Sequence, residues 1–236
     1  MSEPVVIKVG GSLFAEPGAL REVGRWFEAT HVTGQTRLVI AGGGATVDAL
    51  RAIDAANPLP SEVTHWAAIR LMDANTRLLP HWLSGLSVSD QLPRGGTDQA
   101  LLCEPFLQQA EPSLTGKRLS VGWDTTSDAI AARLAEIIGG RLVLLKHTVD
   151  ASIDSLEAAR QAGLIDPETP RHAARLAGVE LLGVAFPGLP ARRPRREGAG
   201  KDSCFFLRKR LTPPILAILL CCSCGKSRGR TTSETS

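Results

Sequence analysis

The residues best suited to chemistry lie in two glycine-rich turns, each of which follows a short apolar run. The first run, residues 5–9, contains Lys8 and leads into Gly10, Gly11 and Ser12. The second, residues 36–41, leads into Gly42, Gly43 and Gly44. Glycine lets the main chain approach a ligand closely and leaves its N–H groups uncovered, while lysine adds a positive charge and serine a hydroxyl. The two turns therefore predict phosphate binding, with ordinary strand-to-helix turns as the alternative.

Neither turn matches a standard nucleotide or hydrolase motif. The chain has no Gly-x-x-x-x-Gly-Lys-Ser/Thr, and Lys8 precedes its glycines rather than following them, which excludes a P-loop. It also lacks Gly-x-Gly-x-x-Gly after a strand and Gly-x-Ser-x-Gly, so neither a dinucleotide site nor a nucleophile elbow is indicated. The five histidines show no zinc-like spacing, and the Cys221, Cys222 and Cys224 cluster has no second ligand group.

A second group of polar residues lies later in the chain. Asp128 stands in the first turn of a strong helix former that runs to residue 138, with Ser127 as the expected N-cap. Lys146 ends an apolar run, and Thr148 and Asp150 follow it. Each has a plainer interpretation, because carboxylates cap helices, lysines are solvated, and threonine and aspartate form turns.

The elements that must position these residues alternate between strands and helices. Strands are expected over residues 5–9, 36–41, 99–106, 141–146 and 179–184, with a short extended piece at 119–121. Helices are expected over 17–30, 45–56, 61–83, 127–138, 152–162 and 169–177, and residues 84–96 are rich in turn formers. This β-α-β-α order predicts an α/β fold with a mainly parallel sheet and right-handed crossovers. Both glycine turns then fall at the carboxyl edge, where such sheets bind ligands.

Charge and composition divide the chain near residue 190. From Pro190 onward there are 11 Lys/Arg and 3 Asp/Glu, a balance of +8, whereas residues 1–189 carry −5. We therefore expect a domain over 1–189 and a basic, poorly ordered tail over 190–236 that adds no strand to the sheet. Aromatic residues make up only 4% of the chain, so a base-stacking platform for nucleic acid is not expected. Membrane or nucleic-acid association through the tail is the open alternative.

The cysteines and the N-terminus point to a reducing compartment. Cys103 is the one cysteine before residue 190, so the expected domain has no internal disulfide framework. The apolar run at residues 5–9 is too short for a signal peptide, and the apolar part of the tail falls short of the about 20 residues that a transmembrane helix needs. We expect a cytoplasmic protein without a membrane partner.

Taken together, the two glycine turns, Thr126 to Ala129 and Thr148 to Asp150 resemble the amino acid kinase superfamily over about residues 4–187. The resemblance implies a three-layer αβα sandwich, ATP and Mg²⁺ as cofactors, a small-molecule acceptor and a homo-oligomer. It implies that Lys8 neutralises the transferred phosphoryl group and that Asp128 orients the lysines near the metal. It places Gly10, Gly11 and Ser12 at the ATP phosphates, Gly42, Gly43 and Gly44 at the acceptor, and Lys146, Thr148 and Asp150 on the nucleotide side.

Within the superfamily, His65 to Asp73 and Trp123 resemble the kinases of methanofuran biosynthesis, which act on [5-(aminomethyl)furan-3-yl]methyl phosphate. The resemblance implies a phosphate monoester as acceptor, held by residues between Pro58 and Gly96. Asp150 is followed by Ala151, where the family commonly has glycine. A non-catalytic nucleotide- or anion-binding protein that retains the fold therefore stays as the alternative function.

Overall fold

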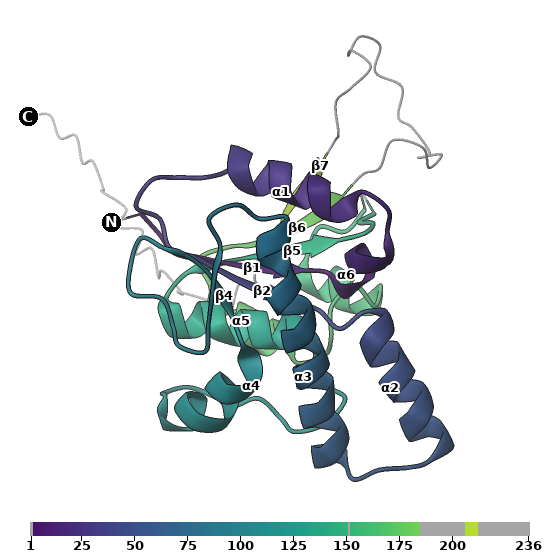
Figure 1. Ribbon diagram of the computed structural model, residues 1–236. Helices are drawn as coiled ribbons and strands as arrows, with labels where there is room; N and C mark the ends of the chain where they lie inside the picture. Colours follow the sequence, from purple (N-terminus) through teal and green to yellow (C-terminus); the bar gives the residue numbers. More distant parts are fainter. Residues whose placement is uncertain (1, 151, 185–205, 212–236) are drawn as a thin grey trace, which may run out of the picture.

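The computed structural model describes residues 2–150, 152–184 and 206–211, which form one sheet with helices on both sides (Figure 1). Along the sheet the strands run in the order β3-β4-β2-β1-β5-β6-β7. Six of them are parallel, and β7 pairs antiparallel with β6. Their bounds are β1 (Val5–Val9), β2 (Arg37–Ala41), β3 (Ser87–Ser89), β4 (Asp98–Leu101), β5 (Arg141–Lys146), β6 (Val179–Val184) and β7 (Phe206–Leu211).

The helices are divided between the two faces of the sheet. One face packs against α1 (Ala19–Ala29) and the other against α3 (Ser61–Leu78) and α5 (Ser127–Ile138), while α2 (Ala45–Ala56) packs against α3 (Figure 1). The remaining helices are short: α4 (Cys103–Pro105), α6 (Leu156–Gln161), α7 (Thr169–Ala173), η1 (Gly11–Ala15), η2 (Leu79–His81), η3 (Phe106–Ala110) and η4 (Glu111–Ser113). The expected α/β fold with three layers and a mainly parallel sheet is confirmed.

The core has two halves because successive strand residues face opposite sides of a sheet. In β1, Val6 packs with α3 and α5, whereas Val5 and Ile7 pack with α1. All five residues of β1 and of β2 are buried, which explains why both read as continuous apolar runs rather than as alternating patterns. Such strands have both faces covered and hold their ends rigidly.

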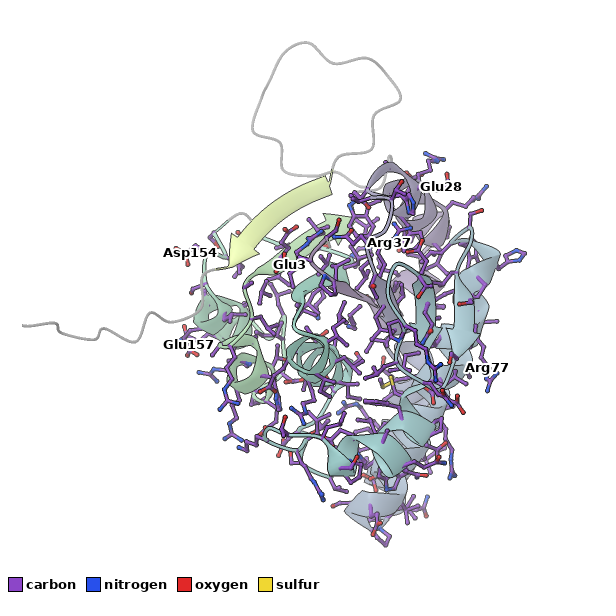
Figure 2. All side chains as sticks on the ribbon, turned by 90° about the vertical axis from the view of Figure 1, so that its left-hand side faces the viewer. Glu3, Glu28, Arg37, Arg77, Asp154 and Glu157 are labelled. Atoms are coloured by element: carbon purple, nitrogen blue, oxygen red, sulfur yellow. The ribbon has the colours of Figure 1, made fainter. Side chains whose placement is uncertain are left out.

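Arg37 is the exception to the apolar pattern of β2 and shows how a buried charge is accommodated. Its guanidinium lies 3.4 Å from the ring centre of Phe27 on α1 and pairs with Asp98 of β4. Figure 2 shows Arg37 close to α1, on the side of the sheet that this helix covers. The arginine therefore ties α1 to two neighbouring strands.

The register brings the ends of the central strands to one edge. Val9, the last residue of β1, pairs with Ala41 of β2 and Leu145 of β5. Gly10, Gly42 and Lys146 thus leave or end adjacent strands at the same level, as the carboxyl-edge prediction requires.

Some expected boundaries were wrong for identifiable reasons. The N-cap of α5 is Thr126, whose side chain accepts a hydrogen bond from the Asp128 N–H at 3.3 Å, and Ser127 is the first helical residue. The strand expected over 99–106 ends at Leu101. Asp73 then accepts hydrogen bonds from the Cys103 and Glu104 N–H groups at 2.6 and 2.9 Å, which starts α4.

Other differences concern short segments. The turn-rich residues 84–96 contain β3, whereas residues 119–121 form no strand. The long helix α3 ends at Leu78 rather than near 83 and continues as η2, which contains Pro80. Proline lacks the N–H that would continue the helical hydrogen bonding.

The expectation that the tail adds no strand is wrong for residues 206–211. These form β7, in register from Val179 opposite Leu211 to Val184 opposite Phe206. Three consecutive basic residues in this segment hid its strand character from sequence patterns. The remainder of the tail, where poor order was expected, lies outside the described residues, and the domain boundary near 189 stays a prediction.

In the part of the chain that the structure describes, no helix combines the length and the apolar character needed to cross a membrane.

Candidate functional site

The two glycine turns lie backbone against backbone. A Cβ atom on Gly11 would come within 2.1 Å of the Gly44 nitrogen, and one on Gly44 within 2.3 Å of the Gly11 oxygen. Gly44 also has a φ of +54°, a conformation that L side chains rarely adopt. Only glycine allows this contact, so the turns after β1 and β2 form one continuous surface.

Gly42 makes room for two polar side chains beside that surface. A Cβ on Gly42 would lie 3.1 Å from both Lys8 Cε and Ser127 Oγ and 2.7 Å from the Gly11 nitrogen. Lys8 from β1 and Ser127 from α5 therefore meet at the second glycine turn.

Asp128 lies between two lysines from neighbouring strands. Its Oδ2 accepts a hydrogen bond from Lys146 Nζ at 2.5 Å, and its Oδ1 lies 2.9 Å from Lys8 Nζ. The Lys8 contact is a buried ion pair. The side chains of Lys8 and Asp128 are only 7% and 6% exposed. A buried carboxylate thus fixes the positions of two ammonium groups.

The electrostatics follow from burial and charge together. Burial raises the pKa of Asp128, but Lys146 and Lys8 outweigh it and bring that pKa down to about 2. Burial lowers the pKa of Lys146, Asp128 opposes this, and Lys8 adds to it, which leaves the pKa of Lys146 at about 8. The carboxylate is therefore charged at neutral pH, whereas Lys146 holds its proton much less firmly than an exposed lysine.

Asp166 holds the start of α5 in place. This buried carboxylate accepts hydrogen bonds from Thr126 Oγ1, the Thr126 N–H and the Ala129 N–H at 2.5, 3.2 and 3.1 Å. It also accepts two from Thr169. The sequence analysis missed Asp166, because the partners in α5 lie about 40 residues earlier and no local motif links them.

Asn75 orients the second glycine turn and was also missed. Its side-chain amide donates to the carbonyls of Gly42 and Gly43 at 2.8 and 2.9 Å. The next residue, Thr76, accepts a hydrogen bond from the Ala41 N–H at 3.1 Å. Both lie in the last turn of α3, a helix that also buries Thr64, His65 and Asp73, so no polar residue in it stood out from the sequence.

A pocket opens beside this machinery. Its polar lining includes Lys8, the glycines Gly11 and Gly42 to Gly44, and Thr125 to Ser127. Its apolar lining is formed by Val47 of α2 and by Ala68, Ile69 and Met72 of α3. The lining is completed by Asp48, Arg51, His65, Gly122 and Trp123. The pocket can hold a small molecule with a charged group near Lys8 and a compact apolar body.

Six of the expected site residues do not line this pocket: Gly10, Ser12, Asp128, Lys146, Thr148 and Asp150. Ser12 is exposed within η1, and Thr148 is exposed with its hydroxyl 2.9 Å from His147 Nδ1. Asp150 accepts a hydrogen bond from the Ser152 N–H at 2.8 Å, which fits a turn-forming role. Lys146 is committed to Asp128. The nucleotide-side roles of these residues stay predictions.

The donor set gives only limited support for a metal. Across residues 2–150, 152–184 and 206–211, no group of three or more His, Cys, Asp or Glu side chains could hold an ion. Mg²⁺ bound with a nucleotide needs few protein ligands, often one or two carboxylates. Asp128 is a buried carboxylate beside the glycine turns, and Lys8 and Lys146 already contact both of its oxygens.

The decisive comparison comes from protein-family models. Residues 3–151 match the model described as the amino acid kinase family, which is more than half of the chain. The chain belongs to the amino acid kinase family. The matched region contains both glycine turns, Asp128 and Lys146.

Solved structures show the same family fold. Uridylate kinase from Archaeoglobus fulgidus has a TM-score of 0.52 and 17% identity, over 75% of this chain and 89% of that one. UMP kinase from Ureaplasma parvum has a TM-score of 0.51 and 11% identity, over 78% and 89%. Aspartate kinase from Synechocystis has a TM-score of 0.52 and 15% identity, over 76% of this chain but only 37% of that one. A comparison with curated protein sequences gave no match.

Proposed function

We propose that this member of the amino acid kinase family is an ATP-dependent small-molecule kinase that transfers the γ-phosphoryl group to a small acceptor. The observation that carries the proposal is Asp128 between Lys8 and Lys146, at the place where the two glycine turns meet. Two adjoining glycine turns beside a pair of lysines suit two phosphate-bearing ligands. A site for a single anion would need only one glycine turn.

The residues fit the demands of phosphoryl transfer. This reaction depends on positioning and on neutralising charge more than on a protein nucleophile. Lys8 lines the pocket and would face the transferred group, while Asp128 keeps Lys8 in place. The N–H groups of Gly10 and Gly42 already donate to the carbonyls of Leu145 and Val9, so the remaining N–H groups of the glycine turns would hold phosphate oxygens. ATP would supply the phosphoryl group, and Mg²⁺, held by the phosphates and Asp128, would neutralise negative charge.

The proposed acceptor is a phosphate monoester such as an aminomethylfuran phosphate of methanofuran-type cofactor synthesis. Support comes from the sequence resemblance of His65 to Asp73 and from the apolar side chains that line the pocket, since a small ring would pack on Val47, Ile69 and Met72. A homo-oligomer and a cytoplasmic location are proposed with it, from the family resemblance and from the cysteine pattern.

The test measures ADP release with ATP, Mg²⁺ and a panel of acceptors that includes UMP, aspartate and the aminomethylfuran phosphate. Lys8→Met should lower kcat at least a hundredfold while thermal unfolding shows a folded protein. Lys117→Met, which changes an exposed loop lysine, is the matched control and should retain full activity. Tight ATP binding without acceptor-dependent ADP release would instead support the non-catalytic binding protein.

A further inference from the structure

Three side chains form a connected group on the α2 side of the pocket. Arg51 of α2 and Trp123 both line the pocket, and the Arg51 guanidinium carbon lies 4.3 Å from the centre of the Trp123 ring. The Trp123 indole N–H donates to Asp54 Oδ2 at 2.8 Å. Asp54 therefore holds the indole, and the indole supports the guanidinium.

Asp54 does not also neutralise Arg51. Its other oxygen accepts a hydrogen bond from the Leu59 N–H at 2.9 Å, and the Leu59 and Trp123 hydrogen bonds lower the pKa of Asp54. Among the residues that the structure describes, Arg51 has a ring contact but no carboxylate within ion-pair distance. An arginine held flat on an aromatic ring keeps its in-plane N–H donors available, and these donors match carboxylate and phosphate oxygens.

We propose that Arg51 binds an oxyanionic group of the acceptor, with Trp123 and Asp54 as positioning residues. That the anion belongs to an acceptor rests on the proposed function, whereas anion binding at Arg51 does not require turnover. Lys8 and Arg51 line the same pocket, and Val47 and Ile69 line it with them. An acceptor of this chemistry would place its oxyanion at Arg51 and its small apolar body against these two side chains.

Asp48 provides a second test, because its negative charge should affect anion binding in the opposite direction to Arg51. It lies three residues before Arg51 on α2, lines the same pocket and is exposed. No ion pair joins Asp48 to Arg51 among the described residues. A carboxylate in the same pocket repels an incoming anion, so Asp48→Asn should tighten anion binding about twofold to fivefold while Arg51→Met weakens it.

The direct test follows the indole N–H resonances by ¹⁵N NMR while inorganic phosphate, and separately acetate, is added to the full chain. The chain has four tryptophans, and Trp123→Phe identifies the Trp123 resonance by its loss. Phosphate should shift this resonance saturably. Arg51→Met should weaken the apparent affinity about tenfold to a hundredfold, because a charge-assisted hydrogen-bond pair is lost. If phosphate shifts the resonance more than acetate does, Arg51 binds the phosphate group of the acceptor. If acetate shifts it more, Arg51 binds a carboxylate group of the acceptor instead.

Matched variants remove the competing explanations. Arg21→Met, which changes an exposed arginine on α1, should leave the titration unchanged. Lys8→Met should keep the Arg51-dependent shift, which separates this site from phosphate bound at the glycine turns. Trp123→Phe keeps an aromatic wall but loses the Asp54 hydrogen bond, and it should raise the acceptor KM severalfold while kcat and the KM for ATP hold.

The outcomes separate this inference from the proposed kinase activity. A missing saturable shift in the wild-type chain, or equal phosphate affinity in wild type and Arg51→Met, would overturn the Arg51 site. So would phosphoryl transfer whose acceptor KM is unaffected by Arg51→Met. Arg51-dependent phosphate binding in a chain that never turns over ATP would overturn only the kinase proposal.

Discussion

Gly11 and Gly44 come from turns after different strands, yet the space for a Cβ on Gly11 is already filled by the Gly44 nitrogen, 2.1 Å away. Their contact makes the first and second glycine turns one rigid unit. A change at either residue must move the backbone of both turns, and with it the pocket end that Lys8 lines.

Gly44→Ala is therefore expected to cost more stability than its backbone conformation alone explains. Gly34 has a φ of +77° but nothing within 4 Å of a Cβ, so Gly34→Ala measures the strain without a clash. We expect about 1 kcal/mol for Gly34→Ala and about 3 kcal/mol or more for Gly44→Ala. Urea unfolding of both variants checks this, and equal losses would contradict the close approach.

Asp128→Asn should lower the free energy of unfolding by about 3 kcal/mol at pH 7, because it leaves two buried ammonium groups without their carboxylate. Adding Lys146→Met should cost less than the sum of the two single losses, since one uncompensated charge is removed. A double-mutant cycle from denaturant unfolding measures the coupling. Strict additivity would show that the pair contributes no interaction energy.

Acid should remove the same contribution in the wild-type protein. The folded pKa of Asp128, about 2, lies below its ordinary value of 3.8. The stabilisation is therefore complete above pH 4 and is lost as the pH falls from about 4 to 2, an effect of about 2 kcal/mol. Unfolding curves of wild type and Asp128→Asn at pH 5 and pH 2.5 should converge at the lower pH, and a constant difference would refute the assignment.

Alkaline pH should act on Lys146 in the opposite sense. Its folded pKa of about 8 lies below 10.5, so the unfolded chain binds more protons between these values. The Lys146 contribution to stability then rises with pH, while the site loses a positive charge. For the proposed kinase, kcat should fall as the pH rises through about 8 without unfolding. Lys146→Arg should move this decline to higher pH with the same acceptor. An unshifted pH profile would mean that a group other than Lys146 causes the decline.

Asn75→Ala should destabilise the protein by about 1 to 3 kcal/mol, because the carbonyls of Gly42 and Gly43 lose their donor. Asn57→Ala changes an exposed asparagine at the C-terminus of α2 and provides the matched control. Thermal unfolding compares the two variants. If the proposed acceptor site is correct, Asn75→Ala should also raise the acceptor KM more than the KM for ATP.

The meeting of Lys8 and the two glycine turns was predictable because it follows from parallel strands with a shared carboxyl edge, whereas only the family resemblance placed Asp128 beside them. Buried apolar runs located β1, β2 and β5, and their ends fixed the neighbourhood without knowledge of side-chain contacts. The family resemblance then supplied roles that spacing alone left ambiguous.

Contacts between distant segments were not predictable in the same way. Asp166 and Asn75 act on residues 32 to 40 positions away, and neither carries a local motif. Ser127 and Thr126 are chemically equivalent caps in the sequence, and only the Asp128 hydrogen bond distinguishes them. The basic residues of 206–211 suggested a solvent-exposed segment outside the sheet. Strand pairing uses the backbone, however, so the edge of β6 could pair with this segment whatever its side chains.

The antiparallel strand at residues 206–211 also affects how this protein should be truncated. A chain that stops at residue 189, where composition changes, removes β7 and leaves the six buried residues of β6 as an open edge. Unpaired N–H and C=O groups on such an edge recruit the same edge of another molecule. The shortened protein would then self-associate through its sheets while each domain stays folded, and low solubility would be mistaken for instability.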